Sequence, residues 1–275
     1  MDTKLRDRVV MVTGASGGIG DAIARQFAAE GARVVLHYRS NVAAVTRLHR
    51  ELGAERSLLV KADLTREKQV TQMMARMVRW GGRVDTLIAN AGSWETRDVP
   101  LHRMSLRQWQ QTHDVVLTSA FLCLREFLKI VAGQKQGNAV LIASTAAIFG
   151  EAGHADYAAA KAAMAFGLTR TLKNEIARIA PTTRNYCGGR INCVCPGWTV
   201  VPRTARQLEN PTMIRRVLAT RALRQIARPS DIAHAVVFLA SDVLSRNITG
   251  QTIVVAGGME GRLLWQPSEI DPTVA

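Results

Sequence analysis

The sequence lacks any apolar run that approaches the roughly 18 residues a membrane-spanning helix needs. Residues 1–8 are rich in charge and lack the apolar core and small-residue cleavage site of a secretory signal. These two absences argue against a membrane protein and a secreted one. We therefore expect a cytoplasmic protein with no membrane partner.

Cysteine is also scarce, with four residues in 275: Cys123, Cys187, Cys193 and Cys195. There is no C-x-x-C pair and no Cys/His cluster with zinc spacing, so we predict neither a disulfide framework nor a metal site. Cys193 and Cys195 alternate in an apolar run and share one face of a predicted strand. We expect four reduced, mostly buried thiols.

Acidic residues are few beside basic ones, 22 against 36, which gives a net charge of +14. Such an excess raises the possibility of nucleic-acid binding. The basic residues are scattered, however, and aromatic residues make up only 5% of the chain, with no aromatic-interleaved basic patch. We interpret the charge as a solvated arginine-rich surface and predict no nucleic-acid partner.

Short apolar, β-branched runs alternate with helical patterns along the chain. We predict strands at residues 8–12, 33–37, 56–61, 85–89, 139–143, 190–195 and 252–255. We predict helices at residues 18–31, 42–52, 67–80, 106–130, 156–180 and 229–240. Continuously apolar strands separated by helices indicate an α/β fold: a doubly wound, Rossmann-type parallel sheet with helices on both faces. We assign residues 1–260 to this single domain and 261–275 to an irregular C-terminal tail.

A glycine-rich turn, Gly14-Ala15-Ser16-Gly17-Gly18-Ile19-Gly20, follows the first predicted strand and opens the first predicted helix. Glycines here let the backbone approach a pyrophosphate, and the helix N-terminus offers free N–H groups to it. The turn therefore predicts a bound dinucleotide.

The G-x-x-x-G-x-G spacing of this turn resembles the short-chain dehydrogenase/reductase family, and the resemblance runs from about residue 5 to about residue 259. Asp63 matches the family's adenine contact, Asn90-Ala91-Gly92 its N-A-G motif and Pro196-Gly197 the pair near the nicotinamide. The resemblance implies these cofactor-binding residues: Gly14, Ser16, Gly18, Ile19, Gly20, Arg39, Ser40, Asp63, Leu64, Asn90, Ala91, Gly92, Tyr157, Lys161, Pro196, Gly197 and Thr199.

Ser144, Tyr157 and Lys161 are the predicted catalytic residues. Tyr157 and Lys161 lie four apart in a helical pattern, and Ser144 ends a predicted strand 13 residues earlier. A carbonyl that accepts hydride must also receive a proton, which Tyr157 can supply. We expect the Lys161 ammonium to lower the phenol's pKa. By resemblance, Lys161 also holds the nicotinamide ribose, and Ser144 donates to the substrate oxygen.

Two positions depart from the family pattern. Val116 stands where the family usually has an asparagine, 28 residues before Ser144. That asparagine supports a water that relays protons to the lysine, and valine lacks the amide; a backbone carbonyl or Thr112 is the alternative support. Val201 replaces a threonine that often contacts the cofactor. These departures leave open a member with weak or no turnover.

The second strand ends in His37-Tyr38-Arg39-Ser40, with Tyr38 where an NAD enzyme would place an acid. Arg39 carries a permanent charge and a planar fork of donors that suit a phosphate. The resemblance and these residues together predict NADP(H) as the cofactor.

The resemblance implies a ketone or secondary alcohol as the substrate, and the sequence does not say which one. The family's lid, residues 203–228, holds seven arginines and one acid, Glu209. That favours an anionic or carrier-linked substrate, although a solvated helix face is the alternative. In the related 3-oxoacyl-carrier-protein reductases, residues matching Lys135 and Arg178 dock the carrier. Candidate pocket residues are Ser93, Trp94, Ala146, Phe149, Glu151, His154, Trp198 and Thr199.

Three functions remain: a ketoreductase, which resembles those acting on 3-oxoacyl thioesters; a reductase of sugars, polyols or secondary metabolites; and a cofactor-binding member with little activity. The family, and the apolar surface of predicted helices 106–130 and 156–180, also predict a homotetramer.

Overall fold

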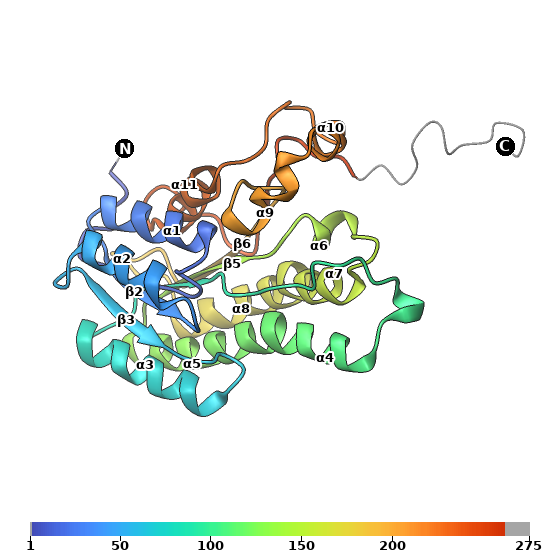
Figure 1. Cartoon of the computed structure of the whole chain (residues 1–275). Coiled ribbons are helices and arrows are strands. Elements are labelled where there is room, and N and C mark those ends of the chain that lie inside the picture. The colour runs from blue at the N-terminus through green and yellow to red at the C-terminus, as the bar shows by residue number, and fades with distance from the viewer. Residues whose placement is uncertain (1, 262–275) are drawn as a thin grey trace, which may run out of the picture.

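The computed structural model describes residues 2–261 and confirms the α/β fold (Figure 1). Seven parallel strands form one sheet in the order β3-β2-β1-β4-β5-β6-β7. The strands are β1 (Val9–Val12), β2 (Arg33–Tyr38), β3 (Ser57–Lys61), β4 (Thr86–Ala89), β5 (Asn138–Ile142), β6 (Arg190–Pro196) and β7 (Thr252–Val255). Apart from Gly261, the predicted tail lies outside the described residues.

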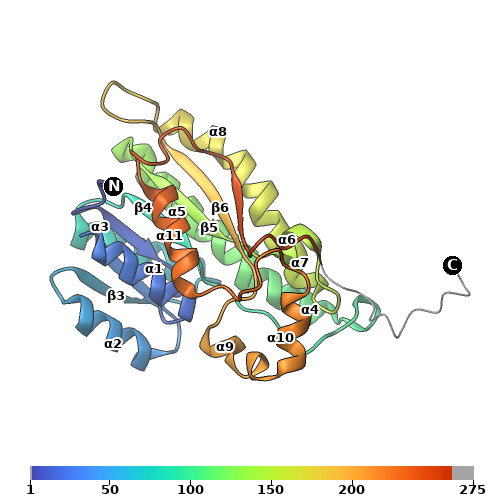
Figure 2. The same ribbon diagram turned by 90° about the horizontal axis from the view of Figure 1, so that it is seen from above.

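Two layers of helices cover the sheet (Figure 2). One layer comprises α1 (Gly18–Ala29), α2 (Val42–Leu52) and α11 (Pro229–Ala240). The other comprises α3 (Glu67–Gly81), α5 (Ser119–Gln134) and α8 (Thr169–Ile179). Within residues 2–261 no helix is both long and apolar enough to cross a membrane.

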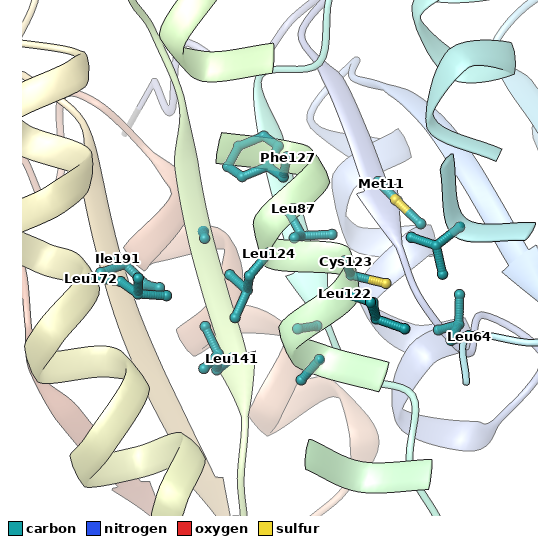
Figure 3. Close-up of a cluster of buried hydrophobic side chains, with 14 of the residues drawn as sticks. Met11, Leu64, Leu87, Leu122, Cys123, Leu124, Phe127, Leu141, Leu172 and Ile191 are labelled. Carbon is teal, nitrogen blue, oxygen red and sulfur yellow. The ribbon is translucent and has the colours of Figure 1, made fainter. Parts of the chain in front are cut away.

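The strands are apolar throughout because both of their faces are buried. In β1, Val9 and Met11 belong to the core beneath α3 and α5, while Val10 and Val12 belong to the core beneath α1 and α11. The first of these cores is seen in Figure 3. The covering helices match it with apolar stripes: α3 buries Val70, Met73, Met74 and Met77, which recur at helical spacing.

Both long predicted helices are interrupted. The predicted 106–130 helix divides into α4 (Leu106–His113), the π-helical turn η2 (Asp114–Thr118) and α5. The predicted 156–180 helix divides into α7 (Ala155–Ala162), the π-helical turn η3 (Ala163–Leu168) and α8. A π turn inserts a residue without removing the apolar periodicity, so the sequence pattern does not reveal it.

Five short elements are present that the sequence pattern does not predict: η1 (Leu101–Arg103), α6 (Ala146–Phe149), α9 (Pro202–Ala205), η4 (Gln207–Glu209) and α10 (Pro211–Leu218). The last three form the lid, which lies over the carboxyl ends of the strands (Figure 2). All four cysteines are free thiols, as expected. Before β6, the Tyr186 hydroxyl accepts from Gly137 N and donates to Gly137 O.

Candidate active site

A cavity of about 1040 Å³ opens at the carboxyl ends of the strands. Pockets for single small ligands typically have about 300–1,000 Å³, so this one has room for a dinucleotide and a substrate. The strand order reverses between β1 and β4, which is where doubly wound folds bind their ligands. Every predicted catalytic and cofactor-binding residue lines this cavity.

The glycine-rich turn is shaped for a close approach to its ligand. Gly14 has a φ of +67°, which disfavours any side chain. A Cβ on Gly18 would lie 2.7 Å from Val201 Cγ1, and one on Gly20 would collide with the Gly14 carbonyl. The backbone therefore forms a cradle that only glycine permits, followed by the N-terminus of α1. These residues fit a dinucleotide pyrophosphate.

His37 ties this turn to the sheet, a role the sequence analysis missed. Its Nδ1 accepts a hydrogen bond from Gly14 N at 3.0 Å, so its Nε2 carries the proton that reaches Ala62 O at 3.0 Å. The ring is 3% exposed, and burial lowers its pKa to about 4. His37 is therefore neutral at physiological pH. In the sequence, the signal for this role was a polar residue, His37, at the end of a predicted apolar strand.

The N-A-G motif supports the same turn. Asn90 Nδ2 donates to Thr13 O at 2.9 Å, and the Thr13 hydroxyl accepts from the N–H groups of Asn90 and Ala91. The motif therefore joins the end of β4 to the turn after β1.

At the adenosine end, Asp63 and Arg39 lie close enough to interact. Hydrogen bonds from Thr65 hold the pKa of Asp63 below its usual value, and the positive charge of Arg39 contributes. Arg39 and Ser40 line the cavity, whereas Tyr38, which precedes them, does not. No carboxylate follows β2 at the place where an NAD enzyme would carry one.

Ser144, Tyr157 and Lys161 come together at the other end. Ser144 follows β5, while Tyr157 and Lys161 share one face of α7. Tyr157 forms a hydrogen bond with Ser144. Lys161 is 3% exposed and donates from Nζ to Ile142 O at 2.6 Å. Burial lowers the pKa of Lys161 to about 8.

The pKa of Tyr157 runs opposite to the expectation that Lys161 would lower it. Burial raises this pKa to about 12, which outweighs the opposing effect of the Ser144 hydrogen bond. Lys161 Nζ lies 5.8 Å from the Tyr157 ring centroid and bonds a backbone carbonyl instead. The phenol is therefore held as a protonated donor.

Comparison with known proteins decides the family. Residues 14–260 match the family model described as "Enoyl-(Acyl carrier protein) reductase". The chain is 35% identical over 259 residues to a 3-oxoacyl-[acyl-carrier-protein] reductase of Synechocystis, covering 94% of this chain and 98% of that one. The chain belongs to the short-chain dehydrogenase/reductase family. It is thus an oxidoreductase that transfers hydride between a nicotinamide and a ketone or secondary alcohol.

Two further similar proteins are named for other substrates. A cis-4-hydroxycyclohexanecarboxylate dehydrogenase of Sinomonas cyclohexanicum is 34% identical over 260 residues, which cover 94% of this chain and 98% of its own. The crystal structure of a putative gluconate dehydrogenase from Agrobacterium tumefaciens superposes with a TM-score of 0.85 at 29% identity, covering 94% of this chain and 98% of its own.

Of the two departures from the short-chain dehydrogenase/reductase pattern, Val116 lies near Lys161 and Val201 lies against the glycine-rich turn. Val116, in η2, is fully buried; a Cβ on Gly92 would lie 3.7 Å from its side chain and 3.5 Å from Lys161 Nζ. The Ser119 hydroxyl donates to Val115 O at 2.6 Å and reaches Val116 O at 3.4 Å. Val201 packs on Gly18.

Thr112, the alternative side-chain support for the relay, uses its hydroxyl at the start of α7. Its hydroxyl donates to Asp156 Oδ2 at 2.7 Å. The other carboxylate oxygen of Asp156 accepts from Tyr157 N at 2.8 Å. Thr112 therefore holds the start of α7, and with it the backbone of Tyr157.

The substrate side of the cavity differs in two residues from the predicted set. Ser93, Trp94, Glu151, His154, Trp198 and Thr199 line it, whereas Ala146 and Phe149 do not. Ala146 is 1% exposed because it packs into the fold at the start of α6. Both ring nitrogens of His154 are buried without a hydrogen bond among residues 2–261, and Nδ1 lies 3.7 Å from Asp98 Oδ1.

The lid arginines do not act as one charged surface. Arg221 is 7% exposed and donates to the carbonyls of Gln225 and Trp198, which fastens the lid to the loop after β6. Of the seven lid arginines, Arg203 and Arg216 line the cavity. Of the positive charge predicted for the lid, only that of these two side chains therefore faces the pocket.

Lys135 and Arg178 lie toward the amino ends of β5 and β6, away from the cavity at the carboxyl ends. Lys135 ends α5 just before β5 begins, and Arg178 is in the last turn of α8, whose end contacts Gly189 before β6. The cavity opens where these strands end. These residues therefore do not flank the pocket of their own chain, and they serve a pocket only if a second copy places it beside them.

Proposed function

We propose that the protein is an NADPH-dependent reductase of ketones in which Tyr157 donates the proton, Ser144 binds the carbonyl oxygen and Lys161 binds the nicotinamide ribose. The observation that carries this proposal is the meeting of these three side chains at one end of a cavity whose far end presents Arg39 and Ser40. When bound, the nicotinamide supplies the hydride, which the carbonyl carbon receives while its oxygen takes a proton.

Burial gives Tyr157 its part in this reaction. A phenol with a pKa near 12 is fully protonated at neutral pH and can donate as negative charge develops on the carbonyl oxygen. Ser144 is placed to share that oxygen because it already bonds Tyr157. Lys161 retains most of its charge at pH 7, since its pKa is about 8. Its ammonium keeps donors for the ribose hydroxyls beyond the one that bonds Ile142 O.

For the cofactor, we propose NADP(H) over NAD(H). A bidentate contact between Arg39 and a 2′-phosphate is worth about 1.5–3 kcal/mol, which corresponds to a preference of about tenfold or more. Fluorescence titration should give NADPH a dissociation constant at least about tenfold below that of NADH. Arg39→Ala should remove most of this preference. Arg47→Ala, on exposed α2, is the matched control and should retain it.

Equal dissociation constants for the two cofactors in the wild type would refute this cofactor assignment. A preference that survives Arg39→Ala would place the phosphate contact elsewhere. Both results leave the ketone reduction itself standing.

For the substrate, we propose a small ketone that is anionic or linked as a 3-oxoacyl thioester. The names of two relatives, a 3-oxoacyl-[acyl-carrier-protein] reductase and a cis-4-hydroxycyclohexanecarboxylate dehydrogenase, support these two classes. A panel of acetoacetyl thioesters, 4-oxocyclohexanecarboxylate, its methyl ester and a keto-sugar should show NADPH oxidation with at least one. Binding of NADPH without oxidation by any of them would favour the weakly active reading suggested by Val116.

A further inference from the structure

Trp94 lies between the proton donor and the lid. Its ring centroid is 5.4 Å from that of Tyr157, with the planes inclined at 45°. Arg203, on α9, places its guanidinium carbon 4.2 Å from the Trp94 ring centroid and donates from Nη2 to Trp94 O at 2.8 Å. The three side chains form a row from α7 to the lid, and each lines the cavity.

The stacking on Trp94 holds a cation without neutralising it. Within residues 2–261, neither Arg203 nor Arg216 has a carboxylate at ion-pair distance. Stacking uses the face of a guanidinium, so its N–H donors at the edge stay available. The backbone bond to Trp94 engages Nη2. Arg203 is therefore oriented with donors to spare.

Three other charged side chains line this side of the cavity: Arg97, Asp98 and Glu151. Arg97 pairs with Glu95, and Asp98 faces His154. Glu151 lines the cavity, and its charge acts on Tyr157. Arg203 and Arg216 thus line the lid side of the cavity without an ion pair within residues 2–261, and the Trp94 ring lies between Arg203 and the proton donor.

We propose that Arg203, held on Trp94, binds a carboxylate of the substrate, so that the enzyme selects ketones and alcohols whose carboxylate is separated from the reacting carbon by about one ring. This inference rests on the proposed reduction of ketones, because Tyr157 defines where the reacting oxygen lies. Arg203 is then a specificity-determining residue and Trp94 its positioning residue.

Calorimetric titration of the NADP⁺-saturated protein tests this directly, without requiring turnover. The two probes are 4-oxocyclohexanecarboxylate and its methyl ester, which differ in one charge. The wild type should bind the acid about 10- to 100-fold more tightly than the ester, as one charge-assisted contact allows. Arg203→Gln should bind both alike, and Trp94→Leu should lose part of the difference.

Arg206→Gln is the matched control, because Arg206 is an exposed lid arginine outside the cavity lining, and it should keep the wild-type difference. Equal affinities in the wild type, or a difference that survives Arg203→Gln, would overturn the inference. So would an Arg203→Gln variant that weakens NADP⁺ and leaves the acid-to-ester ratio intact, since Arg203 would then serve the cofactor. Turnover of the ester by the wild type reports separately on the proposed reduction.

Discussion

His37 shows how one buried side chain couples the sheet to the cofactor cradle. The neutral ring accepts from Gly14 and donates to Ala62, and the bond from Gly14 requires Nδ1 to stay unprotonated. Because burial lowers its pKa from 6.5 to about 4, the unfolded chain takes up a proton at a higher pH than the folded chain does. The free energy of unfolding must therefore fall as the pH falls from about 6.5 to about 4.

We predict that His37 alone contributes a loss of about 2 kcal/mol between pH 7 and pH 5, at 1.36 kcal/mol per unit of pKa shift. Urea denaturation of the wild type and of His37→Gln at both pH values measures this contribution. The variant should lose less stability on acidification, whatever its stability at pH 7. His102→Gln, an exposed histidine in η1, should behave as the wild type. Parallel losses in wild type and His37→Gln would contradict this account of the cradle.

Residue spacing predicted the catalytic candidates but not their surroundings. Tyr157 and Lys161 share a helix face, and the glycine turn follows a strand, so local pattern alone places them. The bonds of His37, and the row from Tyr157 through Trp94 to Arg203, join segments far apart in the chain. No local pattern encodes such contacts. The pKa of Tyr157 was misjudged for the same reason, because its burial depends on the whole fold.

At the scale of elements, both helices that flank the catalytic end contain a π-helical turn. The turn η2 includes Val116, and η3 begins two residues after Lys161. Such turns are frequent at functional sites. In η2 the hydroxyl of Ser119 bonds Val115 O, a backbone acceptor that the ordinary helical pattern would have engaged. The sequence predicted uninterrupted helices because the apolar faces on both sides of each turn stay in phase.

Val116→Asn tests whether the missing amide limits proton supply. If it does, the variant should have a higher turnover number than the wild type, with the largest gain at high pH, where protons are scarce. The buried amide should also cost about 1–3 kcal/mol of stability unless it finds a partner. Steady-state NADPH oxidation from pH 6 to pH 10 measures the first effect, and thermal unfolding measures the second.

Val116→Leu is the control for side-chain shape, since leucine has the same number and branching of side-chain heavy atoms as asparagine and has no amide. A gain shared by both variants would point to packing in η2. A turnover number for Val116→Asn at or below that of the wild type at every pH would show that the protein resupplies the proton by another route.

At the scale of the whole molecule, the order of elements followed from the sequence and the lid did not. Strand and helix alternation predicted the doubly wound sheet because buried parallel strands must be apolar on both faces. The lid elements α9, η4 and α10 span three to eight residues each, too few for a periodic pattern to emerge. Their arrangement depends on contacts such as that of Arg221 with Trp198.

The exposed apolar side chains bear on assembly. On one side of the fold, Leu106 of α4 is 69% exposed and Phe121 of α5 is 45% exposed. On the other side, Phe238 of α11 is 38% exposed and Val254 of the edge strand β7 is 41% exposed. Two separate apolar surfaces would suit a tetramer with two kinds of two-fold interface. We predict a homotetramer by light scattering at micromolar concentration.

Phe121→Glu should shift the mass to a smaller species, because it buries a charge in the proposed interface. Val42→Glu, which is 50% exposed on α2 away from both surfaces, should leave the mass unchanged. A monomeric wild type would refute the assembly prediction, and it would also remove the arrangement in which Lys135 and Arg178 serve a neighbouring pocket.

The most direct test of the central claim is NADPH oxidation by Tyr157→Phe compared with the wild type, on a ketone that the wild type reduces. Positioned proton transfer contributes about 10²- to 10⁴-fold, so the variant should lose about that factor in turnover number. Its affinity for NADPH should stay at the wild-type value, because the phenol is not the principal cofactor contact. Wild-type turnover in Tyr157→Phe would contradict the mechanism and leave Tyr157 as a packing residue.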